Sequence, residues 1–369
     1  MAELSYRPWR QGDDQLLIQL WGDPEGPAAA QFRGALAPDA DPVAHDGGRH
    51  DGGRPDGGRP DGVGGHAPAS GVWRRCVVAE DEGIPVAAGV VFSSALHPER
   101  LWAYVEVARD HRRRGVGTEI LRRLREAAAA APSSGTAGDG TASNGTAGNG
   151  TAGGARLRSK VPAGSAGEAF AAARGFGVLQ RSRQVVVSPG ALRLPVLGDG
   201  TDAGDTKPLV EDLATGSVEL SDAVGRYYTA VHAWDPPAPL SVGRAQQLFL
   251  SDAAGAHGAV VLREPAASAF GTGVFPSKKG RLRAFAVSYA GPSAAAGEEP
   301  SEVMLGHEVR LGGGEAEDAV RGLLALIAYQ HPVRLEVDDS MAALAAVVAP
   351  LLADGRAWQA GPETLVVGD

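Results

Sequence analysis

The chain has 369 residues, a formal net charge of −9, and 52 glycines and 25 prolines. The length suggests about two domains, each with its own hydrophobic core. A single cysteine, Cys76, excludes a disulfide framework and a CxxC metal site, and it is typical of a reducing compartment. No apolar segment is long enough to cross a bilayer, and the first residues do not resemble a signal peptide. We therefore expect a cytoplasmic protein without a membrane partner, and the excess of Ala, Gly and Arg is typical of a GC-rich bacterial genome.

At the start of the chain, the sequence predicts a short strand over 4–9 and then two helices, one opening near Gly12 and one over 28–36. The repetitive tract 45–66 follows. It contains hardly any apolar residues to offset the entropy of ordering, so we expect a disordered insertion. The tract also contains histidines (His45, His50 and His66) and aspartates, but at a spacing too irregular for a preformed metal site. No metal is expected.

Three strands with short connections come next, over 74–79, 85–92 and 101–107, and predict an antiparallel meander. The helix predicted over 117–131 has its apolar residues on one stripe and ends before Pro132. A second disordered insertion is expected at 135–154. The strand 156–161, the helix 167–174 and the strand-rich 176–187 then complete a first domain, residues 1–190.

Residues 191–208 carry the turn and breaker residues of a linker, and a second domain is expected over 209–369. Its predicted elements follow a similar order to those of the first domain, which suggests an ancient duplication. These elements are helices at 217–234, 242–250, 315–329 and 341–352, and strands at 259–263, 282–289, 303–311, 333–337 and 363–367.

The segment with the clearest chemistry is a strand that runs into an Arg- and Gly-rich turn, which in turn opens the helix 117–131. The first N–H groups of a helix have no internal partner, and the helix dipole adds positive charge there. Gly115 and Gly117 let phosphate oxygens approach the main chain, and Arg112–Arg114 add guanidinium groups. The turn is neither a P-loop nor a GxGxxG dinucleotide motif. It predicts a site for a pyrophosphate.

With Arg112-Arg113-Arg114-Gly115-Val116-Gly117, the sequence resembles the GNAT acetyltransferase superfamily, whose signature is Arg/Gln-x-x-Gly-x-Gly/Ala between a strand and a helix. The later 168–176, which ends in Arg-Gly-Phe, fits the helix that often closes the family's fold. The resemblance covers 4–187 and implies an α/β fold of two GNAT-like domains, each a mixed, mostly antiparallel sheet flanked by helices. It also implies acetyl-coenzyme A as co-substrate, held by Val105, Val107, Arg112, Arg113, Arg114, Gly115, Val116, Gly117 and Thr118.

The sequence departs from the family's pattern at the catalytic positions. Ala171 stands where many members have a tyrosine that protonates the leaving thiolate, and Leu101 where some have a glutamate. Glu106 is the best candidate for the general base, with a solvent-facing strand residue as the alternative. Glu99, with His97, could relay a proton through water, and Tyr104 could serve as an acid, although aromatic residues on strands more often pack.

The second half has glycines at the matching turn but opens its helix with acids, in Gly312-Gly313-Gly314-Glu315 and the residues after it. Carboxylates would repel a pyrophosphate, so we expect a degenerate GNAT-like domain. The resemblance implies transfer of acetyl to an amine of a small molecule or peptide, and we expect a monomer or homodimer. The alternative is a non-catalytic acyl-coenzyme A sensor or scaffold. No nucleic-acid partner is expected, because the net charge is acidic and no aromatic platform is interleaved with the arginines.

Overall fold

A computed structural model describes residues 4–22, 27–41, 72–132, 155–198, 207–265, 280–289 and 299–369. These residues form two compact units. Unit 1 comprises the described residues up to Leu179 together with Val366–Asp369, and unit 2 comprises Gln180–Leu365. The end of the chain therefore returns to the first unit, an arrangement that the sequence analysis did not anticipate. The predicted insertions at 45–66 and 135–154 lie outside the described residues, as do the histidines His45, His50 and His66.

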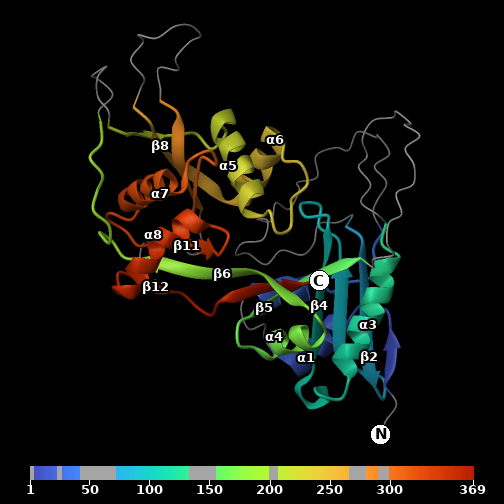
Figure 1. Ribbon diagram of the computed structural model, residues 1–369. Coiled ribbons are helices and arrows are strands. Elements are labelled where there is room, and N and C mark those ends of the chain that lie inside the picture. Colours follow the sequence, from blue (N-terminus) through green and yellow to red (C-terminus); the bar gives the residue numbers. More distant parts are fainter. Residues whose placement is uncertain are drawn as a thin grey trace, which may run out of the picture. The chain divides into compact units, whose positions relative to one another are not determined.

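Unit 1 is built on a mixed sheet (Figure 1). Neighbouring strands from β1 to β4 are antiparallel, whereas β4 and β5 are parallel. The end of β13 lies beyond β5 and brings the chain's last residues to this sheet. In spatial order the strands are β1 (Ser5–Arg7), β2 (Arg74–Asp81), β3 (Ile84–Phe92), β4 (Arg100–Val107), β5 (Arg156–Pro162) and β13 (Thr364–Gly368).

One face of this sheet packs against α3 (Val116–Ala129), which lies along β2, β3 and β4 in Figure 1. Its buried stripe of Ile120, Leu121 and Leu124 contacts the apolar face of the strands. A side chain at Gly89 of β3 would overlap Ile120, so glycine allows this close approach. The other unit 1 helices are α1 (Asp13–Trp21), α2 (Pro27–Ala35), the 3₁₀ turn η1 (Arg109–His111) and α4 (Ala166–Ala173).

Unit 2 repeats this plan. Its sheet has the spatial order β6 (Gly177–Val187), β11 (Val333–Asp338), β10 (Ser301–His307), β9 (Leu282–Tyr289), β8 (Ala256–Arg263) and β7 (Leu209–Asp212), and β12 (Ala357–Gln359) also pairs with β6. Only β10 and β11 are parallel among the described pairs of this unit. The helical segments are α5 (Val218–Val231), α6 (Val242–Ala245), the π-helical η2 (Gln246–Leu250), the 3₁₀ turn η3 (Asp252–Ala254), α7 (Gly313–Ile327) and α8 (Ala342–Ala353).

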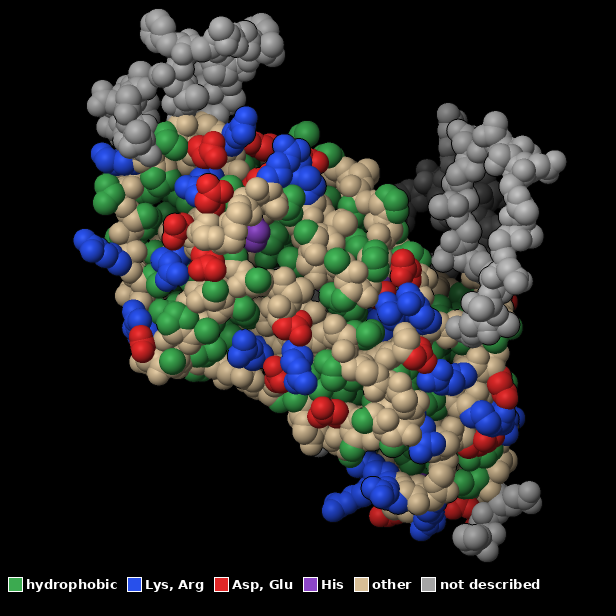
Figure 2. All heavy atoms as spheres, viewed as in Figure 1, with side chains coloured by type: hydrophobic (Ala, Val, Ile, Leu, Met, Phe, Trp, Pro, Cys, Tyr) green, Lys and Arg blue, Asp and Glu red, His purple; other side chains and the backbone are tan. Residues whose placement is uncertain are grey.

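The predicted fold class is confirmed, because each unit is a mixed, mostly antiparallel sheet with helices packed on it. Within the described part of the chain, none of the helices combines the length and the apolar character needed to cross a membrane. Figure 2 shows acidic and basic side chains interspersed over the visible face of the described residues. The net charge of −9 is thus not gathered into one acidic surface on that face.

Candidate active site

The central feature of unit 1 is a gap between the parallel strands β4 and β5. Their pairing covers three residues on each strand and ends at Trp102 and Arg158, whereas the pairing of β4 with β3 continues to Val107. Along β4, exposure changes from buried over the first four residues to half-buried over the last four. Residues 103–107 therefore present an open backbone edge inside a sheet, which can take an extended ligand with amide groups.

The N-terminus of α3 follows directly on this open edge. Gly115 is its N-cap, with a left-handed φ of 86°, and no side chain caps the helix. The Nε of Arg112 donates to the carbonyl oxygen of Val107 at 2.9 Å, which ties the turn to the end of β4. Arg112, Arg113 and Arg114 are exposed. Uncapped N–H groups, the helix dipole and three guanidinium groups are the features that attract an anion to a helix N-terminus.

Gly117, in the first turn of α3, has little free space on the side where a Cβ would stand. A Cβ there would stand 3.4 Å from Cγ2 of Val107 and 3.6 Å from the ring of Phe170, which belongs to α4. Any larger side chain would project into the space between the helix end and the open edge. The glycine therefore keeps the backbone N–H groups of this turn accessible to a phosphate.

The opposite face of β4 carries Trp102, Tyr104 and Glu106, because side chains alternate along a strand. The Phe32 ring of α2 stacks on Tyr104 with centroids 5.0 Å apart and meets Trp102 edge-on at 5.9 Å. Both oxygens of Glu106 accept hydrogen bonds from Arg33, at 2.7 and 2.6 Å. The Tyr104 hydroxyl also donates to Glu106. The Glu106 carboxylate thus has three donors within the protein, which leaves less capacity for a substrate ammonium.

Tyr104 is held in its protonated form. Burial, followed by the charge of Glu106 and the hydrogen bond to it, raises the pKa of Tyr104 well above its usual range. The other proposed proton carriers lie elsewhere. Glu99 is exposed, precedes β4 at its paired end and pairs with Arg156 at 3.0 Å, while His97 is fully buried beside it in the sequence. The structure therefore brings Tyr104 and Glu106 to the gap, and leaves Glu99 and His97 beyond its closed end.

In unit 2 the pairing of β10 with β11 also stops after three residues, and aromatic side chains pack over the end of β10. The strands β10 and β11 pair over three residues, and Leu305 and Gly306 beyond them are buried. The Phe285 ring lies so close over Gly306 that a Cβ there would overlap it. The Tyr227 ring packs edge-on against Phe285, with centroids 5.6 Å apart, and also contacts His307.

In unit 2 the helix after β10, α7, has a carboxylate of its own at its N-terminus. One carboxylate oxygen of Glu315 accepts a hydrogen bond from the backbone N–H of Gly312 at 3.3 Å, at the start of α7. A carboxylate at this place complements the helix dipole. Glu315 therefore complements the N-terminus of α7, and the repulsion of a pyrophosphate there stays a prediction.

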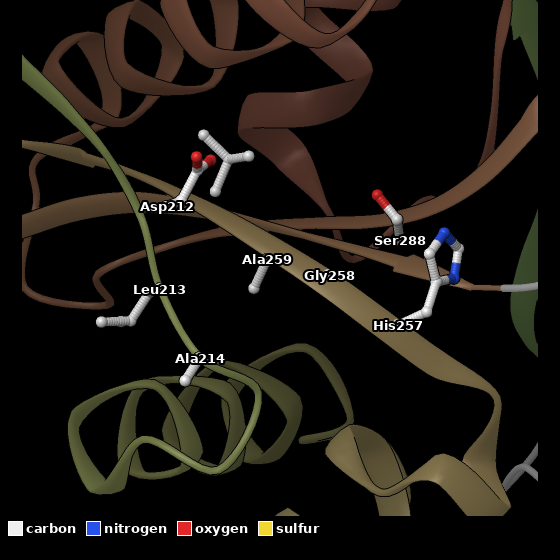
Figure 3. Close-up of a pocket in the computed structure, with 8 residues that line it drawn as sticks. Asp212, Leu213, Ala214, His257, Gly258, Ala259 and Ser288 are labelled. Atoms are coloured by element: carbon white, nitrogen blue, oxygen red, sulfur yellow. The ribbon is translucent and has the colours of Figure 1, made fainter.

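A shallow pocket of ≈ 380 Å³ lies in unit 2 where β7 ends beside β8. Among its lining residues are Asp212, His257 and Ser288, but in Figure 3 Asp212 lies apart from the other two. No hydrogen bond joins them in the described part of the chain, so they do not form a Ser-His-Asp triad. Elsewhere, burial raises the pKa of the Cys76 thiol to about 12, which favours a core role over a nucleophile. The described residues contain no cluster of three metal-ligating side chains.

Solved structures similar to this chain include acetyltransferases at low sequence identity. Among solved structures, the chain is similar to a GCN5-related N-acetyltransferase from Sphaerobacter thermophilus at 14% identity, covering 99% of this chain and 95% of that one, with a TM-score of 0.48. A tandem GNAT protein from the clavulanic acid biosynthesis pathway shows 14% identity, 100% and 98% coverage and a TM-score of 0.47. No protein of curated function matches. Residues 64–136, which include β4, the arginine turn and α3, match the model of the acetyltransferase (GNAT) family, so the chain contains a domain of that family.

Proposed function

We propose that unit 1 is an N-acetyltransferase that transfers acetyl from acetyl-coenzyme A to an amine of a small molecule or peptide. The observation that carries this proposal is the open edge of β4 leading directly to the uncapped N-terminus of α3. An elongated donor with a pyrophosphate at one end and amides along its arm fits both features at once. The same proposal places the reaction in the cytoplasm, in a monomer or homodimer.

In this proposal the turn 112–118 holds the pyrophosphate through the N–H groups of Val116, Gly117 and Thr118. Arg113 and Arg114 are exposed and supply charge, while Arg112 also anchors the turn on Val107. The backbone of Val105 and Val107 pairs with the amides of the donor's arm. An N–H group of the same edge is placed to stabilise the charge that develops on the thioester oxygen.

The acceptor amine must lose a proton to attack. We assign this proton to Glu106 acting through a water molecule, because Glu106 is the carboxylate on β4 beside the open edge while its own oxygens accept from Arg33 and Tyr104. Tyr104 keeps its proton and orients that carboxylate. Glu99 has no part in this mechanism, since it lies beyond the closed end of the gap.

A second function is favoured by one specific observation. The Glu106 carboxylate has three donors within the protein, and Ala171 on α4 has no proton to give. A protein that binds acyl-coenzyme A without turning it over, as a sensor or scaffold, would have the same gap and the same helix end.

One experiment separates the two functions. Acetyl-coenzyme A is added to the full chain, and both the melting temperature and the release of free coenzyme A are followed against a panel of amines. Stabilisation with turnover on at least one amine supports the acetyltransferase. Stabilisation without turnover on any amine supports the sensor, and the absence of stabilisation contradicts both.

A further inference from the structure

A buried cation stands at the closed end of the gap, which we call the apex: the last paired residues, Trp102 of β4 and Arg158 of β5. Arg158 is 1% exposed, and its guanidinium carbon lies 3.9 Å from the centroid of the Trp102 indole. The ammonium of Lys160 lies 5.7 Å from the same ring. The two cations and the ring are on neighbouring strands of unit 1, where the strands begin to diverge.

The apex is where the reacting end of the donor would lie, an argument that rests on the proposed function. The open edge spans the five residues 103–107, about 16 Å at the rise of a strand. A donor whose pyrophosphate is bound at α3 must run along this edge away from the helix. Its thioester therefore points toward Trp102 and Arg158.

Acyl transfer creates negative charge at that end. The amine nitrogen attacks the thioester carbon, a C–N bond forms and the carbonyl electron pair moves to oxygen. When the carbonyl re-forms, the C–S bond breaks and sulfur leaves with the electron pair as a thiolate, while the amine proton goes to Glu106 through water. The α4 residue where the resemblance implies a proton-donating tyrosine is Ala171, so this chain needs another way to stabilise the thiolate.

We propose that Arg158 stabilises the coenzyme A thiolate by its charge, in place of a proton donor. A guanidinium keeps its charge at every accessible pH, and its attraction for an anion acts over several ångströms in a buried site. Arg158 has further interactions within the protein, and the proposal needs only its charge at the apex. The Trp102 face holds the guanidinium in place.

The test compares binding of coenzyme A with binding of desulfo-coenzyme A, which lacks the thiol, by calorimetry at pH 7 and pH 9.5. The two ligands share every contact except the sulfur, so their ratio reports the thiolate alone. We expect coenzyme A to gain about fivefold over desulfo-coenzyme A between the two pH values, because a stabilised thiolate forms at lower pH. The absorbance of the bound thiolate in the ultraviolet gives a second readout on the same samples.

Variants assign the effect to one residue. Arg158→Gln should abolish the pH-dependent gain. Arg158→Lys keeps the charge and should retain most of the gain. The lysine variant also provides a test if the glutamine variant does not fold. Arg156→Gln is the matched control, since Arg156 is an exposed arginine two residues earlier on β5. A gain that persists in Arg158→Gln, or its absence in the wild type, overturns the inference while leaving the proposed function standing. Failure of both ligands to bind overturns both.

Discussion

In both units the pairing of two parallel strands stops after three residues, and the units differ in how the strand end and the following helix are covered. In unit 1 the last four residues of β4 are half-buried and the helix that follows is uncapped. In unit 2 Phe285 and Tyr227 cover the end of β10, and Glu315 accepts from the N-cap of α7. The same backbone arrangement therefore occurs twice, and the side chains at the strand end and at the helix N-terminus differ between the two units.

This comparison also shows how few residues separate the half-buried strand end and uncapped helix of unit 1 from the covered strand end and capped helix of unit 2. An aromatic ring over Gly306 and a carboxylate at the fourth residue of a helix-opening turn are single-residue features. Both are stabilising in themselves, because one buries an apolar ring and the other complements a helix dipole. An open gap gives up this stabilisation, which is the expected cost of a ligand site.

The largest effect is expected from the Phe285 ring, which covers the end of β10 in unit 2. Phe285→Ala should lower the free energy of unfolding by about 4 kcal/mol, because Phe285 is fully buried and its removal leaves a cavity over Gly306. Urea denaturation measures this. Tyr329→Ala, at an exposed site of the same unit, serves as the control. A loss below about 1.5 kcal/mol would mean that the ring is not closely packed over the end of β10.

The second prediction compares the two helix ends directly. Gly117→Glu should weaken coenzyme A binding by about a hundredfold, because a carboxylate would project toward the pyrophosphate from a narrow place. Gly314 occupies the same position of α7 as Gly117 does of α3, with open space around it, and Gly314→Glu should leave binding unchanged. Titration calorimetry measures both. Equal affinities of the two variants for coenzyme A would mean that the pyrophosphate does not bind at the N-terminus of α3.

The sequence anticipated the elements of this site better than its contacts. The strand predicted over 101–107 and the helix over 117–131 are observed as β4, Arg100–Val107, and α3, Val116–Ala129, because their periodic patterns are strong. The partner of Glu106 was missed, since Arg33 lies 73 residues earlier in a short helix with little periodicity. A pairing that stops at Trp102 and Arg158 depends on how whole strands diverge, and a local pattern does not record it.

Alkaline pH tests one tyrosine in each unit, the buried Tyr227 and the half-buried Tyr104. Burial raises the pKa of Tyr227, with a further contribution from Asp338, and burial and then Glu106 raise that of Tyr104. Each phenol is neutral when folded, so stability is constant below the unfolded pKa near 10.0 and falls as the pH rises above it. We expect a loss of about 1 kcal/mol per pH unit for Tyr227. Urea titrations of Tyr227→Phe and Tyr104→Phe at pH 9 and 11 should each show a smaller loss than the wild type.

The smallest effect concerns the carboxylate at α7. Glu315→Ala should cost about 1 kcal/mol in unfolding free energy, and Glu315→Gln about half of that, because the amide oxygen still accepts from Gly312 but carries no charge. Urea denaturation measures the two losses. The variant also makes the end of α7 resemble that of α3, so calorimetric stoichiometry tests what closes unit 2. One coenzyme A per chain in Glu315→Ala means that removing the carboxylate does not by itself create a second site, whereas two would mean that Glu315 alone prevents binding at α7.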